Sequence, residues 1–158
     1  MKEQLIATML TVVSGVIVGV LVFIVGQILT SIWLKPLQQY KDLKKETVYK
    51  LTYYANLYSN VIDLADYSDS DKFVEEFKLA SDELRKLSCS LKGFAETISW
   101  FRIGIPNQET INDSADLIML LSNSFFTPYN TGESHEQNRE NYYIANEIFK
   151  KLKCYYKK

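Results

Sequence analysis

The chain has 158 residues, of which 47% are hydrophobic, and its formal net charge at pH 7 is -1. Sequence-independent binding of double-stranded DNA depends on many clustered cations, so this balance argues against double-stranded DNA as a partner. The charges are spread unevenly, because none occurs between Glu3 and Lys35. The chain therefore divides into an apolar segment, residues 1–35, and a charged remainder, residues 36–158.

Residues 5–34 form one apolar run that is long enough to cross a membrane as a helix. Such a helix is roughly 45 Å long, more than the ~30 Å hydrocarbon core of a bilayer requires. A secretory signal has a shorter apolar stretch, of roughly 7 to 15 residues, followed by small residues at a cleavage site. This run ends instead in Trp33, Leu34 and Lys35. We therefore predict a single transmembrane helix that anchors the rest of the chain in the lipid bilayer.

Basic residues flank the predicted span asymmetrically. Only Lys2 and the terminal amine precede it, whereas several lysines follow it closely, namely Lys35, Lys41, Lys44, Lys45 and Lys50. Flanks rich in lysine are retained in the cytoplasm. The prediction is a single-pass protein of the cell inner membrane, with its N-terminus outside and residues 36–158 in the cytoplasm. Cys89 and Cys154 would then lie in a reducing compartment, and we expect both thiols to be free.

Small residues within the predicted span share one helix face. Gly15 and Gly19 are four residues apart, and Gly26 continues their face further along. This spacing lets two backbones approach closely in lipid and favours a homo-oligomer. Glycines are also simply common in membrane helices, and that alternative stays open. Gln27 can donate and accept several hydrogen bonds, so it would either reach the headgroups or pair with its copies.

Beyond the span, the pattern predicts helices throughout. Pro36 can occupy the first turn of a new helix, and it marks a kink or a restart. The next helix is expected over residues 37–65, with apolar residues at three- and four-residue spacing: Val48, Leu51, Tyr54, Ala55, Tyr58, Ile62 and Ala65. Turn-forming residues at 67–71 then interrupt the pattern.

The clearest helix is expected over residues 73–101. Its apolar residues alternate intervals of four and three: Phe73, Phe77, Ala80, Leu84, Leu87, Leu91, Phe94, Ile98 and Phe101. After Gly104 and Pro106, Asn107 can cap a third helix that carries Ile111, Ala115, Ile118, Leu121 and Phe125. A loop at 127–135 precedes a fourth helix, expected over 136–155, whose core side is Tyr142, Ala145, Ile148, Phe149, Leu152 and Tyr155.

Amphipathic helices on short connections, without strand-like alternation, predict an all-α fold. The expected architecture is an N-terminal single transmembrane helix followed by a cytosolic helical bundle of about four helices. The bundle is expected to begin within a few residues of the membrane. The long helix over 73–101 would also permit a bundle that is completed by helices from a neighbouring copy.

No residue pattern indicates catalysis. The single histidine, His135, lies in an expected loop, and there is no Cys-x-x-Cys or His-x-x-x-His pair for zinc. Neither a phosphate-binding glycine loop nor a dinucleotide fingerprint occurs. Adjacent acids such as Glu75 and Glu76 point apart on a helix and are expected to be solvated. We expect no enzyme, no catalytic residue, no metal and no cofactor.

One face of the helix expected over 37–65 carries aromatic and amide residues where charges are usual, namely Tyr49, Tyr53, Asn56 and Asn60. Exposed rings can stack on a base or on a partner side chain, and amides can read polar edges. Charge for an anionic ligand could come from Arg102 and from the lysines Lys44, Lys45 and Lys50. The simpler interpretation, which we favour, is that a third or fourth helix of the bundle covers this face.

The layout resembles the small membrane-anchored effectors of bacterial antiviral signalling, in particular the type III CRISPR ancillary effector that senses cyclic oligoadenylate through its cytosolic domain. The resemblance rests on the Gly15 to Gly19 span, the segment Trp33-Leu34-Lys35-Pro36 and the tyrosine-rich residues 51–56. It implies an oligomer in which a bound cyclic oligonucleotide changes the packing of the spans and disrupts the membrane. The expected function is a membrane-anchored oligomeric sensor or effector; the alternative is a passive membrane-tethered adaptor between proteins.

Overall fold

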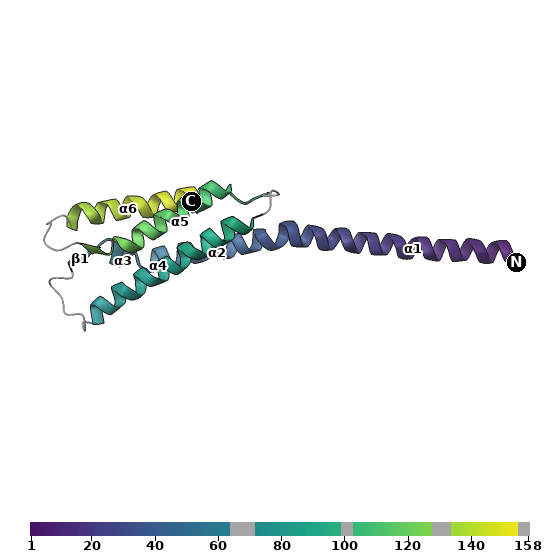
Figure 1. Ribbon diagram of the computed structural model, residues 1–158, viewed down its shortest axis with the longest axis horizontal. Coiled ribbons are helices and arrows are strands. Elements are labelled where there is room, and N and C mark those ends of the chain that lie inside the picture. Colours follow the sequence, from purple (N-terminus) through teal and green to yellow (C-terminus); the bar gives the residue numbers. More distant parts are fainter. Residues whose placement is uncertain (64–71, 99–102, 128–133, 155–158) are drawn as a thin grey trace.

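The computed structural model describes residues 1–63, 72–98, 103–127 and 134–154. It begins as one long rod, in which α1 (Lys2–Leu29), a π-helical segment η1 (Thr30–Leu34) and α2 (Lys35–Tyr53) follow without a break (Figure 1). The short helix α3 (Ala55–Tyr58) comes next, and then α4 (Lys72–Thr97), α5 (Gln108–Asn123) and α6 (Ser134–Lys151). Apart from one two-residue strand pair, the described elements are helical, as predicted.

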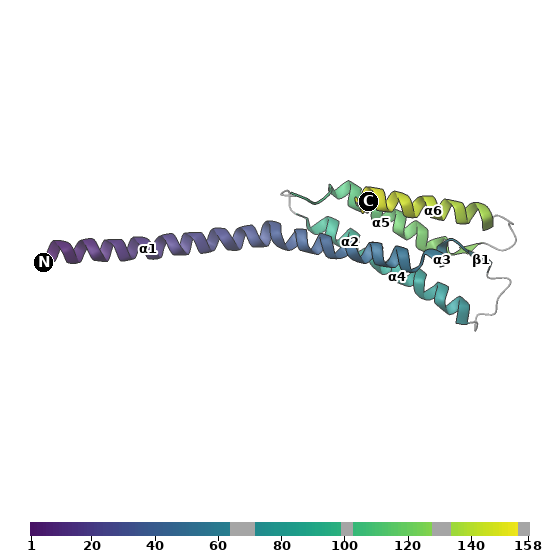
Figure 2. The same cartoon turned by 180° about the vertical axis from the view of Figure 1, so that it is seen from behind.

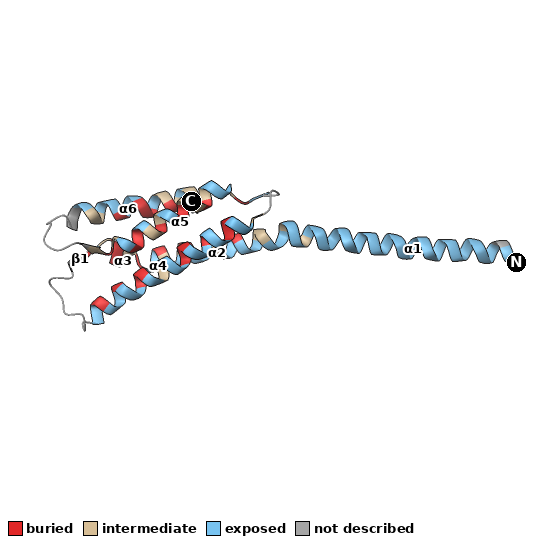
Figure 3. Cartoon of the chain, viewed as in Figure 1, coloured by how far each residue is buried: buried red, intermediate tan, exposed pale blue. Residues whose placement is uncertain are grey.

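Helix α1 projects away from the other helices, and Figure 2 shows from behind that α2 carries the same rod into the bundle. Its described side chains are exposed along its whole length (Figure 3). The rod is the one described helix that is long and apolar enough to cross a membrane, and its most apolar stretch of 18 residues is not buried. The apolar surface of α1 therefore has no partner within the described chain. The predicted long apolar N-terminal helix is confirmed.

The rod continues through Pro36 as a helix, without the restart that the sequence offered as one possibility. Pro36 lies in the first turn of α2, directly after the π-helical segment. There the Lys35 N–H donates to the carbonyl oxygen of Thr30, five residues back. A proline lacks the N–H of a regular helix, and its ring crowds the carbonyl oxygen four residues earlier. The wider π turn leaves room for that ring, so the helix continues.

The bundle consists of α2, α4, α5 and α6, and α4 packs most extensively on α5. The core is closed by apolar side chains that all four helices contribute, of which the largest fully buried ones are Leu51, Phe77, Leu84, Leu87, Leu91, Ile111, Ile118, Leu121, Phe125, Ile148 and Leu152. Burying such side chains stabilises the fold by roughly 1.5–3 kcal/mol each. The predicted core stripe of α4 is thus correct from Phe77 to Phe94 but wrong at Phe73, which is 43% exposed, and the stripe of α5 is correct throughout.

Two predicted helices end earlier than expected. The helix expected over 37–65 stops at Tyr53, because Tyr54 adopts φ -90° and ψ 12°, and Ile62 lies instead in a strand. Strand β1 (Ile62–Asp63) pairs in parallel with β2 (Phe126–Thr127), a pairing that the sequence did not indicate. The helix expected over 73–101 ends at Thr97. Ala65 and Phe101, which were assigned to the core, lie outside the described residues.

The fourth helix also differs from its predicted bounds. It begins at Ser134, so His135 falls in its first turn and not in a loop. It ends at Lys151 because Lys153 adopts φ 52° and the Cys154 N–H donates to the carbonyl oxygen of Phe149, a common way to close a helix. Tyr155 lies outside the described residues. At the start of α5, Asn107 caps the helix as predicted, accepting the Thr110 N–H at 2.9 Å.

One predicted core residue of α6 is wrong. Tyr142 is 59% exposed, whereas its neighbour Asn141 is fully buried. The Asn141 amide donates to the carbonyl oxygen of Tyr58 at 2.9 Å and accepts from the Ser124 hydroxyl at 2.6 Å. A buried polar group needs such partners, and these hold α6 with Asn141 inward and Tyr142 outward.

Candidate functional site

Three side chains on one face of the rod fasten it to the bundle. The Trp33 indole N–H donates to the carbonyl oxygen of Ile103 at 3.1 Å. The Tyr40 hydroxyl donates to the Leu152 carbonyl oxygen at 3.1 Å. We call Trp33, Tyr40 and Lys44 the clasp, because the Lys44 ammonium likewise donates to a backbone carbonyl oxygen, that of Lys153, at 2.6 Å.

The clasp acts on groups that need partners. The last carbonyl groups of a helix receive no hydrogen bond from an N–H of the same helix, and that end of the helix carries partial negative charge. Leu152 and Lys153 follow the last turn of α6, so a hydroxyl and an ammonium group suit their carbonyl oxygens. Burial raises the pKa of Tyr40 well above its usual value. The Tyr40 hydroxyl therefore keeps its proton, and remains a donor, at any ordinary pH.

A small cavity of about 230 Å³ lies beside the clasp, lined by Tyr40, Lys44, Gly104, Ile105, Pro106, Leu152 and Lys153. Gly104 adopts φ +83°, and a Cβ atom there would lie 3.3 Å from the Cδ1 atom of Leu37. Only glycine suits both the left-handed backbone and this close approach. The loop before α5 is thus fitted to the rod at the level of Leu37.

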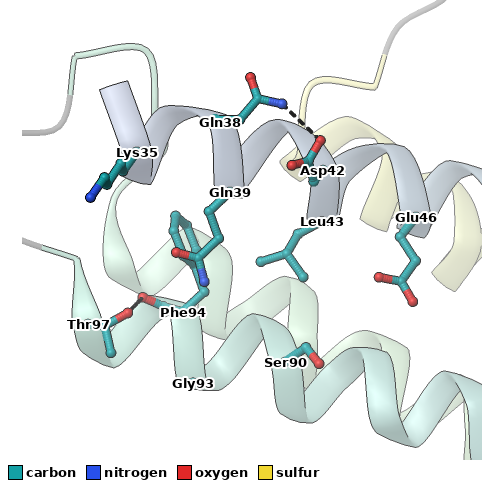
Figure 4. Close-up of a pocket in the computed structure, with 10 residues that line it drawn as sticks. All are labelled: Lys35, Gln38, Gln39, Asp42, Leu43, Glu46, Ser90, Gly93, Phe94 and Thr97. Atoms are coloured by element: carbon teal, nitrogen blue, oxygen red, sulfur yellow. Dashed lines mark hydrogen bonds between the residues drawn. The ribbon is translucent and has the colours of Figure 1, made fainter. Parts of the chain in front are cut away.

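An open groove of about 670 Å³ runs between α2 and α4 (Figure 4). Its floor includes Leu43 and Phe94, and Gly93 leaves it wide on the α4 side. Asp42 and Glu46 of α2 line it together with Lys35, Gln38, Gln39, Ser90 and Thr97. Figure 4 shows the Gln38 amide reaching Asp42, to which it donates at 3.0 Å. The groove therefore combines an apolar floor with a rim that carries two carboxylates, Asp42 and Glu46, and one ammonium group, Lys35.

The structure brings together only part of the predicted ligand face. Tyr49 and Tyr53 stack with their ring centroids 5.8 Å apart, and they are 62% and 65% exposed. The interpretation that another helix of the bundle covers these two rings is therefore wrong. Asn56 and Asn60 are also exposed, but they follow the break at Tyr54 and do not continue the face of α2.

The amide groups of that face are partly engaged. The Asn60 amide donates to the backbone carbonyl oxygen of Asn56 at 2.7 Å, so this N–H serves the local turn. Arg102, the predicted cationic member of the site, lies outside the described residues. Of the predicted ligand residues, Tyr49 and Tyr53 are thus the pair that the structure places side by side on the surface.

The predicted packing residues of the span are open on the rod. Among the described residues, no atom other than the adjoining residues and backbone of the same helix lies within 4 Å of the place that a Cβ atom would take at Gly15, Gly19 or Gly26. The Thr30 hydroxyl donates to the carbonyl oxygen of Gly26 at 2.8 Å, within the same helix. Gln27 is exposed, and among residues 1–63 and the other described segments no hydrogen bond reaches its side-chain amide. Close packing between spans stays a prediction.

An ion-pair cluster that the sequence did not reveal ties α2 to α4. The Lys50 ammonium lies 2.9 Å from Glu46 Oε1 and 2.8 Å from Glu83 Oε2. Burial lowers the pKa of Lys50, but its hydrogen bonds to Glu83 and Glu46 outweigh this and raise the pKa overall. The hydrogen bond from Lys50 is also the main cause that lowers the pKa of Glu83. Only 12% of the Lys50 side chain is exposed, so this cluster is a polar link between the two helices that is shielded from solvent.

Within the described ranges, no group of three or more His, Cys, Asp or Glu side chains is placed to hold a metal ion. Cys89 is exposed and Cys154 half-buried, and burial raises the pKa of the Cys154 thiol. In comparisons with protein-family models, curated proteins and solved structures, nothing matches this chain.

Proposed function

We propose that the protein is a membrane-anchored sensor or effector, in which α1 crosses the bilayer and the bundle reads a cytosolic ligand. The unburied apolar surface of α1 supports the anchor, since a core helix of a soluble protein would be mostly covered. The lysines that follow the rod's apolar part support a cytoplasmic bundle. The unbroken helix from α1 into α2 argues for an anchor over a cleaved signal.

The observation that carries the proposal is the clasp. It bonds the rod to the loop before α5 through Trp33 and to the end of α6 through Tyr40 and Lys44. A change in how α5 and α6 pack would therefore pull on the same helix that enters the bilayer. A ligand can drive such a change only if it binds two packings with different affinity.

The exposed pair of Tyr49 and Tyr53 suits a ligand that presents flat rings. The outer face of either ring can stack on a nucleobase, an interaction worth about 1–3 kcal/mol per base. Together with the resemblance to cyclic-oligoadenylate effectors, this favours a cyclic oligonucleotide. The α1 helices of different copies, packed against one another at Gly15 and Gly19, would then repack and make the membrane permeable.

The test uses full-length protein in phospholipid vesicles that hold a self-quenched dye. We expect one cyclic oligoadenylate of a size series to release the dye and to stay bound in native mass spectra of the protein in nanodiscs. Tyr49→Leu/Tyr53→Leu is expected to weaken retention about tenfold, whereas Tyr142→Leu/Tyr143→Leu, an exposed pair on α6, is the matched control. If no member of the series binds or causes release, sensing of cyclic oligonucleotides is wrong.

The second candidate is a passive membrane-tethered adaptor. The exposed aromatic pair of Tyr142 and Tyr143, with Arg139 5.9 Å from the Tyr143 ring centroid, favours it, because tyrosine and arginine are enriched in protein interfaces. An adaptor would keep its activity when α1 is exchanged for an unrelated anchor. An effector would lose it when Gly15 and Gly19 are replaced by leucine, although the bundle still folds.

A further inference from the structure

We propose that α2 joins copies of this chain side by side, with Lys41 and Lys45 of one copy on the carboxylates of Asp42 and Glu46 of the next. The partner in the α2–α4 groove is thus a second copy of the chain. The inference rests on the proposed membrane anchor, because the anchor would hold all copies parallel and at one depth.

The exposed side of α2 carries two rows of opposite charge. Residues four apart share a helix face, so Lys41 and Lys45 form one row and Asp42 and Glu46 form the other. Adjacent residues are about 100° apart around a helix, so the two rows lie on different flanks. All four side chains are exposed. One flank of α2 therefore carries two lysines, and the flank that borders the groove carries two carboxylates, with Lys35 two turns before Asp42.

The lysines of the basic row have no polar partner in the described part of the chain. Neither Lys41 nor Lys45 has a hydrogen bond or an ion pair among the residues that the structure describes. On the acidic row, Asp42 accepts from the Gln38 amide but meets no cation in the described segments. Glu46 shares Lys50 with Glu83, which leaves one of its oxygens open. Each row thus has charge to offer to the other row of a neighbour.

The two rows match in height when copies stand parallel. Lys41 and Asp42 differ by one residue, as do Lys45 and Glu46, and one residue is about 1.5 Å along a helix. A neighbour at the same depth therefore brings its two lysines level with the two carboxylates. The rows are different surfaces, so the contact is head-to-tail and repeats from copy to copy until a ring closes.

The groove suits the stems of those lysines as well as their charges. Leu43 and Phe94 form an apolar floor just inside the acidic row, and Gly93 has no side chain to fill it. The methylene groups of a lysine can cover such a floor while the ammonium group stays at the rim. Exposed ion pairs contribute little to association, so close packing between the spans in lipid drives it and the charges set which flanks meet.

The experiment measures the oligomeric state of the full-length protein in lipid nanodiscs by native mass spectrometry. Lys41→Glu/Lys45→Glu gives two acidic flanks, and Asp42→Lys/Glu46→Lys gives two basic flanks. We expect the oligomeric fraction of each variant alone to fall at least about tenfold below that of the wild type. A 1:1 mixture of the two variants is expected to restore assembly with alternating copies, and the chain with all four changes is expected to restore it alone.

Two controls separate this contact from general effects of charge. Glu75→Lys/Glu76→Lys, on α4, changes the net charge by the same amount as Asp42→Lys/Glu46→Lys and is expected to leave the oligomer intact. Glu46→Gln breaks the contact with Lys50 without reversing the charge, and it should reduce assembly far less than Asp42→Lys/Glu46→Lys. If circular dichroism shows an unfolded double variant, Lys41→Glu and Asp42→Lys serve as the mixing pair.

The outcomes distinguish this inference from the function on which it rests. An oligomer that ignores all the charge reversals, or a wild-type monomer at every protein-to-lipid ratio, would overturn the contact between flanks. Failure of the mixture to recover what each variant lost would overturn it too. Removal of the protein from membranes by alkaline carbonate would instead overturn the anchor itself.

Discussion

The Tyr40 hydroxyl donates to the carbonyl oxygen of Leu152 at 3.1 Å, across 112 positions of the sequence. This bond is buried, and the Tyr40 ring also stacks on Phe94, with centroids 6.1 Å apart. Tyr40 therefore contacts both the end of α6 and the core face of α4. A single side chain of α2 thus links the positions of α4 and α6.

Replacing Tyr40 by phenylalanine is expected to lower the free energy of unfolding by about 1–3 kcal/mol, because the change keeps the ring but leaves a buried carbonyl oxygen without its donor. Denaturant unfolding followed by circular dichroism measures this. Tyr53→Phe is the matched control, since Tyr53 is 65% exposed and should change stability by less than about 0.5 kcal/mol. Equal effects of the two substitutions would contradict the role of the buried bond.

Gly104→Ala is expected to destabilise the protein by about 1 kcal/mol or more, because alanine resists φ +83° and its Cβ would press on Leu37. Gly93→Ala is the opposite control. Gly93 lies within α4, and no described atom outside the adjoining part of that helix lies within 4 Å of its missing Cβ, so alanine there should stabilise the helix by roughly 0.5–1 kcal/mol. Thermal unfolding of both variants tests whether the two signs differ.

The Glu83 carboxylate is expected to make the free energy of unfolding depend on pH in the acidic range. Its pKa is lowered from the usual value near 4.5, so it stabilises the fold above that pH, and the contribution is lost as the pH falls through the lowered pKa. Glu83→Gln should therefore flatten the acid limb of the stability profile and cost about 1 kcal/mol at pH 7. Unfolding curves between pH 7 and pH 3 measure both effects. Parallel curves for the wild type and the variant would rule out this account.

Asn141→Ala is expected to cost about 2–4 kcal/mol, because it strips partners from the Tyr58 carbonyl oxygen and the Ser124 hydroxyl inside the bundle. Asn146→Ala, on the exposed side of the same helix, removes only a bond to its own turn and should be nearly neutral. Chemical denaturation compares the two. A small effect at position 141 would mean that water replaces the amide without cost.

Much of the fold could be predicted because it follows from spacing along the chain. The long apolar N-terminal helix, the core stripe from Phe77 to Phe94 and the cap at Asn107 each depend on residues within a few turns of one another. Hydrophobic periodicity and capping act over such short ranges, so the sequence alone expresses them.

What could not be predicted depends on distant partners. Asn141 stands in the apolar register of α6, four residues before Ala145, but its partners Tyr58 and Ser124 come from other elements. The clasp likewise joins side chains of the rod to backbone carbonyl groups far along the chain. Every residue has such a group, so the sequence does not show which of them will accept a hydrogen bond. For the ligand site, the pattern singled out Tyr49 and Tyr53, but we favoured a covered face, and the pattern could not show that the helix breaks at Tyr54.

The π-helical segment at Thr30–Leu34 sets the rotational phase between the two halves of the rod. A π turn takes in one residue more than an α turn, so α1 is turned by about 100° from where an uninterrupted α-helix would put it. The glycine side of α1 and the charged flanks of α2 must therefore be counted on separate helical wheels. Deleting one residue from this segment would rotate α1 by about a quarter turn beneath an unchanged bundle, and would aim a different side of it at its neighbours.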